Sequence, residues 1–168
     1  MRHRFTQQVP EGGVAIGAVD LNIRTRHQLV PLLKGLQYIF VTEGLNELVF
    51  EALELCILGD KKKTGRLGMS LWEIFVLSSI RQGLNIDYDF LTDQANQHKL
   101  VRQILGVYSA PSSDGKEYHV QTVKDNVRLL SEEQLRSIND LVVKSTHGLI
   151  KKKKDWTPIL YGQKEIAL

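Results

Sequence analysis

Apolar residues recur at helical spacing along most of the chain, and the first two such segments lie in its first third. Between residues 26 and 41 they fall three or four positions apart, which predicts an amphipathic helix. Thr42 follows as a candidate N-cap, and a second apolar stripe then runs to Gly59, a candidate C-cap. We therefore expect two helices joined by a short connection, the second with glutamates on its outer side.

A third helix is predicted by the segment that begins near residue 69. Ser70 and Glu73 fit a capping box, in which each side chain binds the backbone N–H of the other residue. The helix that follows is apolar on most of its sides and should end at Gly83. A helix of this kind is expected at the centre of the core.

Two shorter helices should complete a three-helix unit over residues 69–106. Asp87 is a candidate cap for the first of them, and a break at residues 97–98 precedes the second, which begins at Lys99 and closes at Gly106. Three helices with short connections, the last one short and basic, have the outline of a helix-turn-helix unit.

The rest of the chain continues the helical pattern after a loop at residues 107–118. One helix is expected at 122–130, and a second capping box at Ser131 opens a helix that runs to about residue 150. No segment alternates as a strand does, so the predicted fold class is all-α, a helical bundle. Its parts are an irregular N-terminal arm (1–23), a helical domain (24–107), a helical extension (108–150), and a basic linker with a C-terminal tail (151–168).

Charge is distributed unevenly along this pattern. The formal net charge is +3, and the positive residues cluster at Lys61–Arg66 and Lys151–Lys154. Clustered lysines suit a polyanion-binding surface, because each neutralised phosphate releases counterions. A run of about eighteen apolar residues, as a membrane span needs, does not occur. With Cys56 as the only cysteine, a cytoplasmic protein is the simplest interpretation.

The short third helix of the unit carries side chains suited to reading base edges. Arginine, lysine, glutamine and asparagine all form hydrogen bonds with guanine or adenine in the major groove. A plain three-helix core with a polar outer face fits the same spacing, and periodicity does not decide between the two. The candidate groove-facing residues are Asn96, His98, Lys99, Arg102 and Gln103.

The basic hinge before the unit is a second candidate contact. Lys61, Lys62, Lys63 and Arg66 could bind backbone phosphates or enter a minor groove, or they could form a solvated loop. Arg81, near the end of the third predicted helix, could bind phosphate or pair with an aspartate of the next helix.

Catalytic motifs are not found in the sequence. The five histidines lack metal-ligand spacing, and there is no phosphate-binding loop, dinucleotide fingerprint or nucleophile elbow. We therefore assign no catalytic residue, no metal ligand and no cofactor.

As a set, the motifs at residues 62–107 are more specific than any one of them alone. A Gly-Arg-x-Gly turn precedes the apolar helix, which ends in Arg-Gln-Gly-Leu; an Asp-Tyr-containing helix follows, and the segment closes with HKLVRQILG. This order resembles the N-terminal region of bacterial insertion-sequence transposases, in particular the ISNCY-type branch of the DDE transposases. The flanking segments resemble that branch as well, so the likeness covers about residues 20–154.

The resemblance implies a helical module that binds double-stranded DNA at the terminal inverted repeats of the element. Relatives continue into an RNase-H-like domain whose two Asp and one Glu hold Mg²⁺ for strand cleavage and joining. Here the sequence after Lys154 reads DWTPILYGQKEIAL, and Asp155 is given no catalytic role. We expect a truncated product without transposase activity of its own, with Mg²⁺ belonging to the missing domain.

A different class of function remains open beside DNA binding. The acidic helix at 43–58 and the helix at 132–150 both carry apolar stripes suited to helix partners. On this alternative the chain forms a homodimer, or associates with full-length transposase and regulates it. No membrane partner is expected.

Overall fold

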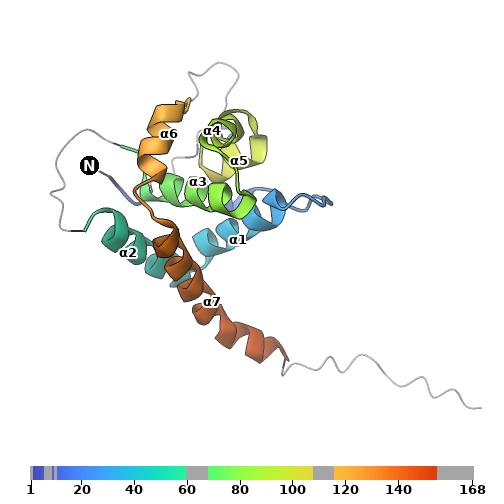
Figure 1. The fold of residues 1–168 in the computed structure, drawn as a ribbon. Coiled ribbons are helices and arrows are strands. Elements are labelled where there is room, and N and C mark those ends of the chain that lie inside the picture. Colours follow the sequence, from blue (N-terminus) through green and yellow to red (C-terminus); the bar gives the residue numbers. More distant parts are fainter. Residues whose placement is uncertain (1, 6–8, 10, 60–67, 108–115, 155–168) are drawn as a thin grey trace, which may run out of the picture.

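The computed structural model describes residues 2–5, 9, 11–59, 68–107 and 116–154, with side chains described as far as Thr146. Within these ranges the structure contains helices and no strand, which confirms the predicted all-α class (Figure 1). The elements are η1 (Ile16–Ala18), α1 (Leu29–Val41), α2 (Leu45–Ile57), α3 (Leu71–Leu84), α4 (Tyr88–Gln97), α5 (Lys99–Ile104), α6 (Val120–Val127) and α7 (Glu132–Lys154).

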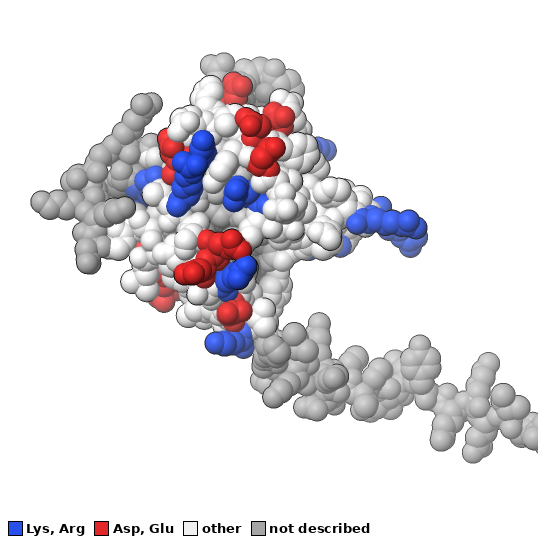
Figure 2. Space-filling view, in the orientation of Figure 1, with Lys and Arg blue, Asp and Glu red and all other residues white. Residues whose placement is uncertain are grey.

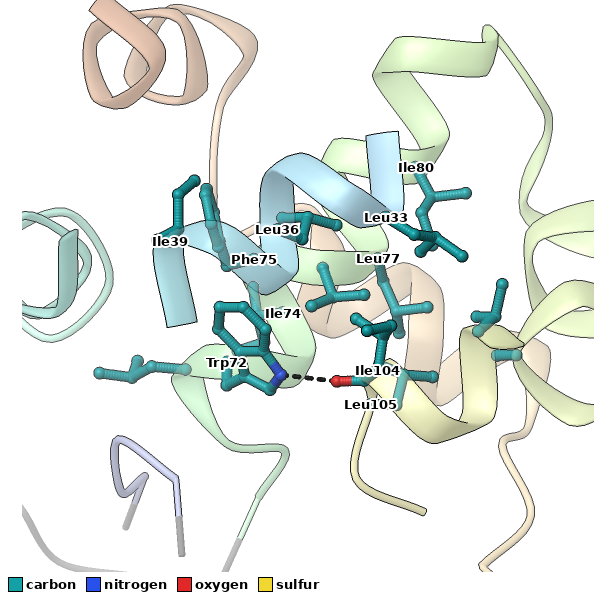
Figure 3. Packing of buried hydrophobic residues seen from close by; sticks show 14 of the residues in the cluster. Leu33, Leu36, Ile39, Trp72, Ile74, Phe75, Leu77, Ile80, Ile104 and Leu105 are labelled. Atoms are coloured by element: carbon teal, nitrogen blue, oxygen red, sulfur yellow. Dashed lines mark hydrogen bonds between the residues drawn. The ribbon is translucent and has the colours of Figure 1, made fainter. Parts of the chain in front are cut away.

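Helix α3 is the centre of the core, as its sequence predicts. Every residue from 71 to 80 is buried, and the helix contacts α1, α2, α4, α6 and α7. Trp72 is fully buried, and its indole Nε1–H donates a hydrogen bond of 2.8 Å to the carbonyl oxygen of Ile104 (Figure 3). This bond ties the beginning of α3 to the end of α5.

The predicted caps are mostly confirmed. At Ser70 the capping box is complete, since its Oγ accepts from Glu73 N and the Glu73 carboxylate accepts from Ser70 N. Asp87 caps α4 through Phe90 N, and Ser131 and Gln134 form the second box. These pairs depend on residues three positions apart, which is why the sequence predicts them well.

Two predicted helix boundaries are wrong. Thr42 ends α1 and does not cap α2, because its hydroxyl donates to the Tyr38 carbonyl; Gly44, with φ of 82°, occupies the N-cap position. Gly83 lies inside α3, which ends instead at Asn85 in the left-handed conformation. Asparagine is among the few residues that adopt this conformation readily, so it can take the place of the glycine.

The N-terminal arm is irregular, but its first residues are packed into the fold. The carbonyl oxygens of His3 and Arg4 accept hydrogen bonds from the backbone N–H groups of Leu71 and Trp72. These groups in the first turn of α3 have no partner within the helix. The Arg4 guanidinium also binds the carboxylates of Glu47 and Glu54 on α2, at 2.5 and 2.8 Å. The arm thus connects α2 with α3.

Helix α7 begins against α2 and α3 and then leaves the body of the molecule (Figure 1). Leu135 and Ile138 are buried in its first half, whereas Val143 is 51% exposed. A bilayer-spanning helix, judged by length and apolarity, is not found in the part of the chain that the structure describes.

Candidate nucleic-acid interface

The predicted three-helix unit is formed by α3, α4 and α5, and His98 lies at the junction of the last two. It ends α4 and caps α5, with its Nδ1 accepting from Val101 N at 3.5 Å. Burial lowers the pKa of His98, and the electrostatic effect of the nearby His27 lowers it further. The imidazole is therefore neutral at pH 7 and suited to hydrogen bonding more than to charge attraction.

Arg102, a predicted base-reading residue, is directed at the protein backbone. Its Nη1 donates to the carbonyl oxygens of Ala95, Asn96 and Lys116, at 3.3 to 3.4 Å, and its Nη2 donates to Lys116 as well. The guanidinium therefore joins the end of α4 to the segment before α6. Contact with DNA stays a prediction for this residue.

Asn96 also serves this segment. Its Nδ2 donates to the carbonyl oxygen of Tyr118 and its Oδ1 accepts from Tyr118 N, both at 2.8 Å. This two-point contact imitates the pairing between backbone strands and uses both ends of the amide. Asn96 therefore has a structural role, and its contact with a DNA groove stays a prediction.

Replacing Asn96 with alanine should lower the free energy of unfolding by about 2 kcal/mol, because two hydrogen bonds to a buried residue are lost together. Urea unfolding followed by far-UV circular dichroism measures the change. Gln97→Ala, at the exposed neighbouring position of the same helix, is the matched control and should change stability little. Equal effects of the two substitutions would contradict the proposed clamp on Tyr118.

Glu73 has a second role beyond its cap. Its Oε1 accepts hydrogen bonds from the Tyr118 hydroxyl, at 2.6 Å, and from the Lys116 ammonium. Burial raises the pKa of Tyr118 well above its usual value, and the Glu73 charge raises it further. The sequence predicted the cap from local spacing, but the contacts with residues 43 and 45 positions away carry no local signal.

Arg81 lies over an aromatic ring. Its guanidinium carbon is 4.3 Å from the centre of the Tyr88 ring, within cation–π distance. Among the residues the structure describes, no carboxylate forms an ion pair with Arg81. The predicted pairing with an aspartate of α4 is therefore not observed, and phosphate binding by Arg81 stays a prediction.

Of the other predicted contacts, Lys99 is exposed and Gln103 is half-buried. The predicted hinge contacts lie outside the described residues, namely Lys61, Lys62, Lys63 and Arg66.

The loop before α1 brings further basic residues to α5, which the sequence analysis missed. Arg26 and His27 share the lining of a cavity of about 520 Å³ with His98, at the beginning of α5. Arg24 and Arg26 are exposed, and neither forms an ion pair with any described residue. A signal existed in the Arg-x-Arg-His spacing of residues 24–27, but the contact with α5 depends on the tertiary fold.

The charged side chains on the face shown in Figure 2 are mixed. Acidic and basic groups lie close together over its middle, whereas a group of basic side chains projects at the right, where Figure 1 draws the loop before α1. The projecting group is the clearest concentration of unopposed positive charge on this face.

Comparison with protein-family models gives no match for the chain, and comparisons with curated proteins and with solved structures give none either.

Proposed function

We propose that the chain binds double-stranded DNA as the N-terminal module of an insertion-sequence transposase, at the terminal inverted repeats of the element. One observation supports this above the others. The exposed residues Arg26 and His27 of the loop 22–28 line one cavity with His98, which caps α5 at one end of the three-helix unit. The motifs at 62–107, which resemble this class of transposase, supply the same three helices.

The residues divide into two roles on this proposal. Phosphates are bound by the exposed residues Arg24, Arg26 and Lys99. Contacts between basic side chains and phosphates release counterions from the DNA and so give most of the affinity. Arg102 and Asn96 hold the segment at 116–118 against α4 and so position the surface. His98 and Gln103 are the groups left for contact with base edges.

Replacing Arg24 and Arg26 together with alanine should weaken duplex binding about tenfold and lower the slope of log affinity against log salt by about 2, because each phosphate contact contributes about 0.9. Fluorescence anisotropy with a labelled duplex across a salt series measures both quantities. Binding to scrambled and to terminal-repeat duplexes should fall alike, since phosphate contacts carry no sequence information.

Arg128→Ala with Lys144→Ala is the charge-matched control, because both residues are exposed and lie on other elements. If the control variant loses as much affinity for the duplex as the variant at Arg24 and Arg26, the loss is due to the lower net charge and not to contacts at these two positions. A further variant, with Lys61, Lys62 and Lys63 changed to alanine, tests the predicted hinge. Unchanged binding in it would remove the hinge from the interface.

A protein-interaction module is the second candidate, and a specific observation favours it. An open, mainly apolar groove lies between α1, α3 and α7, away from the residues assigned to DNA. Interaction through this groove and DNA binding at α5 are compatible in one molecule.

A further inference from the structure

The cavity at the beginning of α5 has a mixed lining. Leu84 and Ile86 contribute apolar surface, whereas Arg26 and Gln94 contribute a positive charge and an amide. None of the lining residues is acidic, and the volume of about 520 Å³ is in the range of sites that hold a small organic group. A ligand with an apolar face and a negative charge matches both parts of this lining.

Phe90 borders the cavity as an aromatic ring without a partner. It is 50% exposed, whereas the other phenylalanines, at positions 5, 40, 50 and 75, are buried or half-buried. Those four belong to a chain of ring contacts that includes Trp72, and Phe90 forms no ring contact with any described residue. Its backbone N–H is held by the Asp87 cap. The ring is therefore a fixed, exposed surface on which a planar group can stack.

The two histidines of the cavity are both hydrogen-bond donors toward a ligand. Nδ1 of His27 accepts from Leu29 N at 3.1 Å, and Nδ1 of His98 accepts from Val101 N at 3.5 Å. In the neutral imidazole the proton then lies on Nε2. Among the described residues neither Nε2 has an acceptor. A metal ligand would need the lone pair of one ring nitrogen while the other donates its N–H, and this arrangement reverses that order.

We propose that the cavity holds one unpaired nucleotide of a DNA strand. Its base stacks on Phe90, an acceptor atom of the base is bound by His27 and His98, and its phosphate is bound by Arg26. The inference rests on the proposed DNA-binding function and adds the form of the DNA, because the bases inside an intact duplex are stacked on one another and expose no face to Phe90. A backbone phosphate alone would leave Phe90 without a role, and a purely apolar ligand would leave the two N–H donors unpaired.

The charges of α4 limit how much of a strand can bind here. Asp87, Asp89 and Asp93 are exposed on this helix and lie outside the lining of the cavity. Their negative charges repel the phosphates of a strand that runs along α4. The strand therefore meets the cavity at one nucleotide, as an unpaired end does.

Fluorescence anisotropy of the full chain with three labelled duplexes of one sequence tests the proposal. The first is blunt, the second carries one unpaired thymidine at a 3′ end, and the third carries an abasic residue there, which keeps the phosphate but lacks the base. A parallel series places the same groups at a 5′ end. In at least one series the unpaired thymidine should bind about tenfold tighter than the blunt end, because stacking of one base contributes about this much. The abasic duplex should bind within about threefold of the blunt one.

Substitutions in the full chain assign the preference to the cavity. Phe90→Ala should reduce the ratio of overhang to blunt affinity to about one, whereas Phe90→Trp should retain it. Tyr38→Ala is the matched control, because Tyr38 is an aromatic residue of similar exposure, 44%, on α1. His27→Asn should lower the ratio about fivefold, since the asparagine oxygen still accepts from Leu29 N but the Nε2–H donor is lost.

The blunt duplex tests the proposed function, and the ratio of the two affinities tests this inference, so the two fail separately. A chain that binds blunt and overhang duplexes alike in both series overturns the inference alone, and so does a Phe90→Ala variant that keeps the preference. An abasic end bound as tightly as the thymidine end would assign the cavity to phosphate only. Free thymidine monophosphate bound as tightly as the overhang would assign the cavity to a free nucleotide, and either result overturns the proposal.

Discussion

Replacing Trp72 with alanine should lower the free energy of unfolding by about 5 kcal/mol, the upper end of the range for large core side chains. The indole is fully buried and lies 4.9 Å from the ring centre of Phe40 and 6.0 Å from that of Phe75. Alanine leaves a cavity among these rings, which belong to different helices and cannot collapse into it freely. The loss is comparable with the whole stability of a small domain, so the variant should be largely unfolded at modest urea concentrations.

Trp72→Phe separates packing from hydrogen bonding. Phenylalanine keeps most of the apolar volume but removes the Nε1–H, so the Ile104 carbonyl loses its donor and stability should fall by about 2 kcal/mol. Urea unfolding followed by far-UV circular dichroism measures both variants. Leu55→Ala is the control, because this leucine is 77% exposed. A Trp72→Ala variant as stable as Leu55→Ala would show that α3 is not the centre of the core.

Local spacing accounts for what the sequence predicted well. The capping boxes at Ser70 and Ser131 and the apolar periodicity of α3 are set by residues within one or two helical turns, so the helices and the core followed from the pattern. Helix ends were less predictable, because a left-handed residue can be asparagine at one end and glycine at another.

The candidate site was harder to predict for a different reason. Arg102 and Asn96 have the side chains of base-reading residues, but their polar groups bind the backbone of residues that lie far along the chain. The sequence pattern of a basic side chain on a helix face is the same whether that side chain contacts solvent, DNA or a carbonyl oxygen. Likewise the contact of the loop 22–28 with α5 arises only when α1 packs against α5.

The Glu73 carboxylate offers the second large effect. Substitution by glutamine should lower the free energy of unfolding by about 3 kcal/mol at pH 7, because a buried group loses charge-assisted hydrogen bonds. Both carboxylate oxygens accept: Oε2 from Ser70, and Oε1 from Tyr118 and Lys116. An amide has one acceptor oxygen and one NH₂, so a donor must face a donor on one side. Glu117→Gln, at an exposed position, should change stability little.

The effect of Glu73→Gln should depend on pH in a defined direction. Burial raises the pKa of Glu73, but the hydrogen bonds from Lys116 and Tyr118 outweigh it, so the pKa lies below the usual 4.5. A carboxylate with a lowered pKa contributes stability that is complete above the unfolded value and lost as the pH falls through the folded value. The difference in unfolding free energy between wild type and variant should therefore be constant near neutrality and shrink below about pH 4.5. Urea titrations at a series of pH values measure it. A difference that grows on acidification would mean that the buried carboxyl is protonated in the native state, and the hydrogen bonds from Lys116 and Tyr118 would then not hold it as an anion.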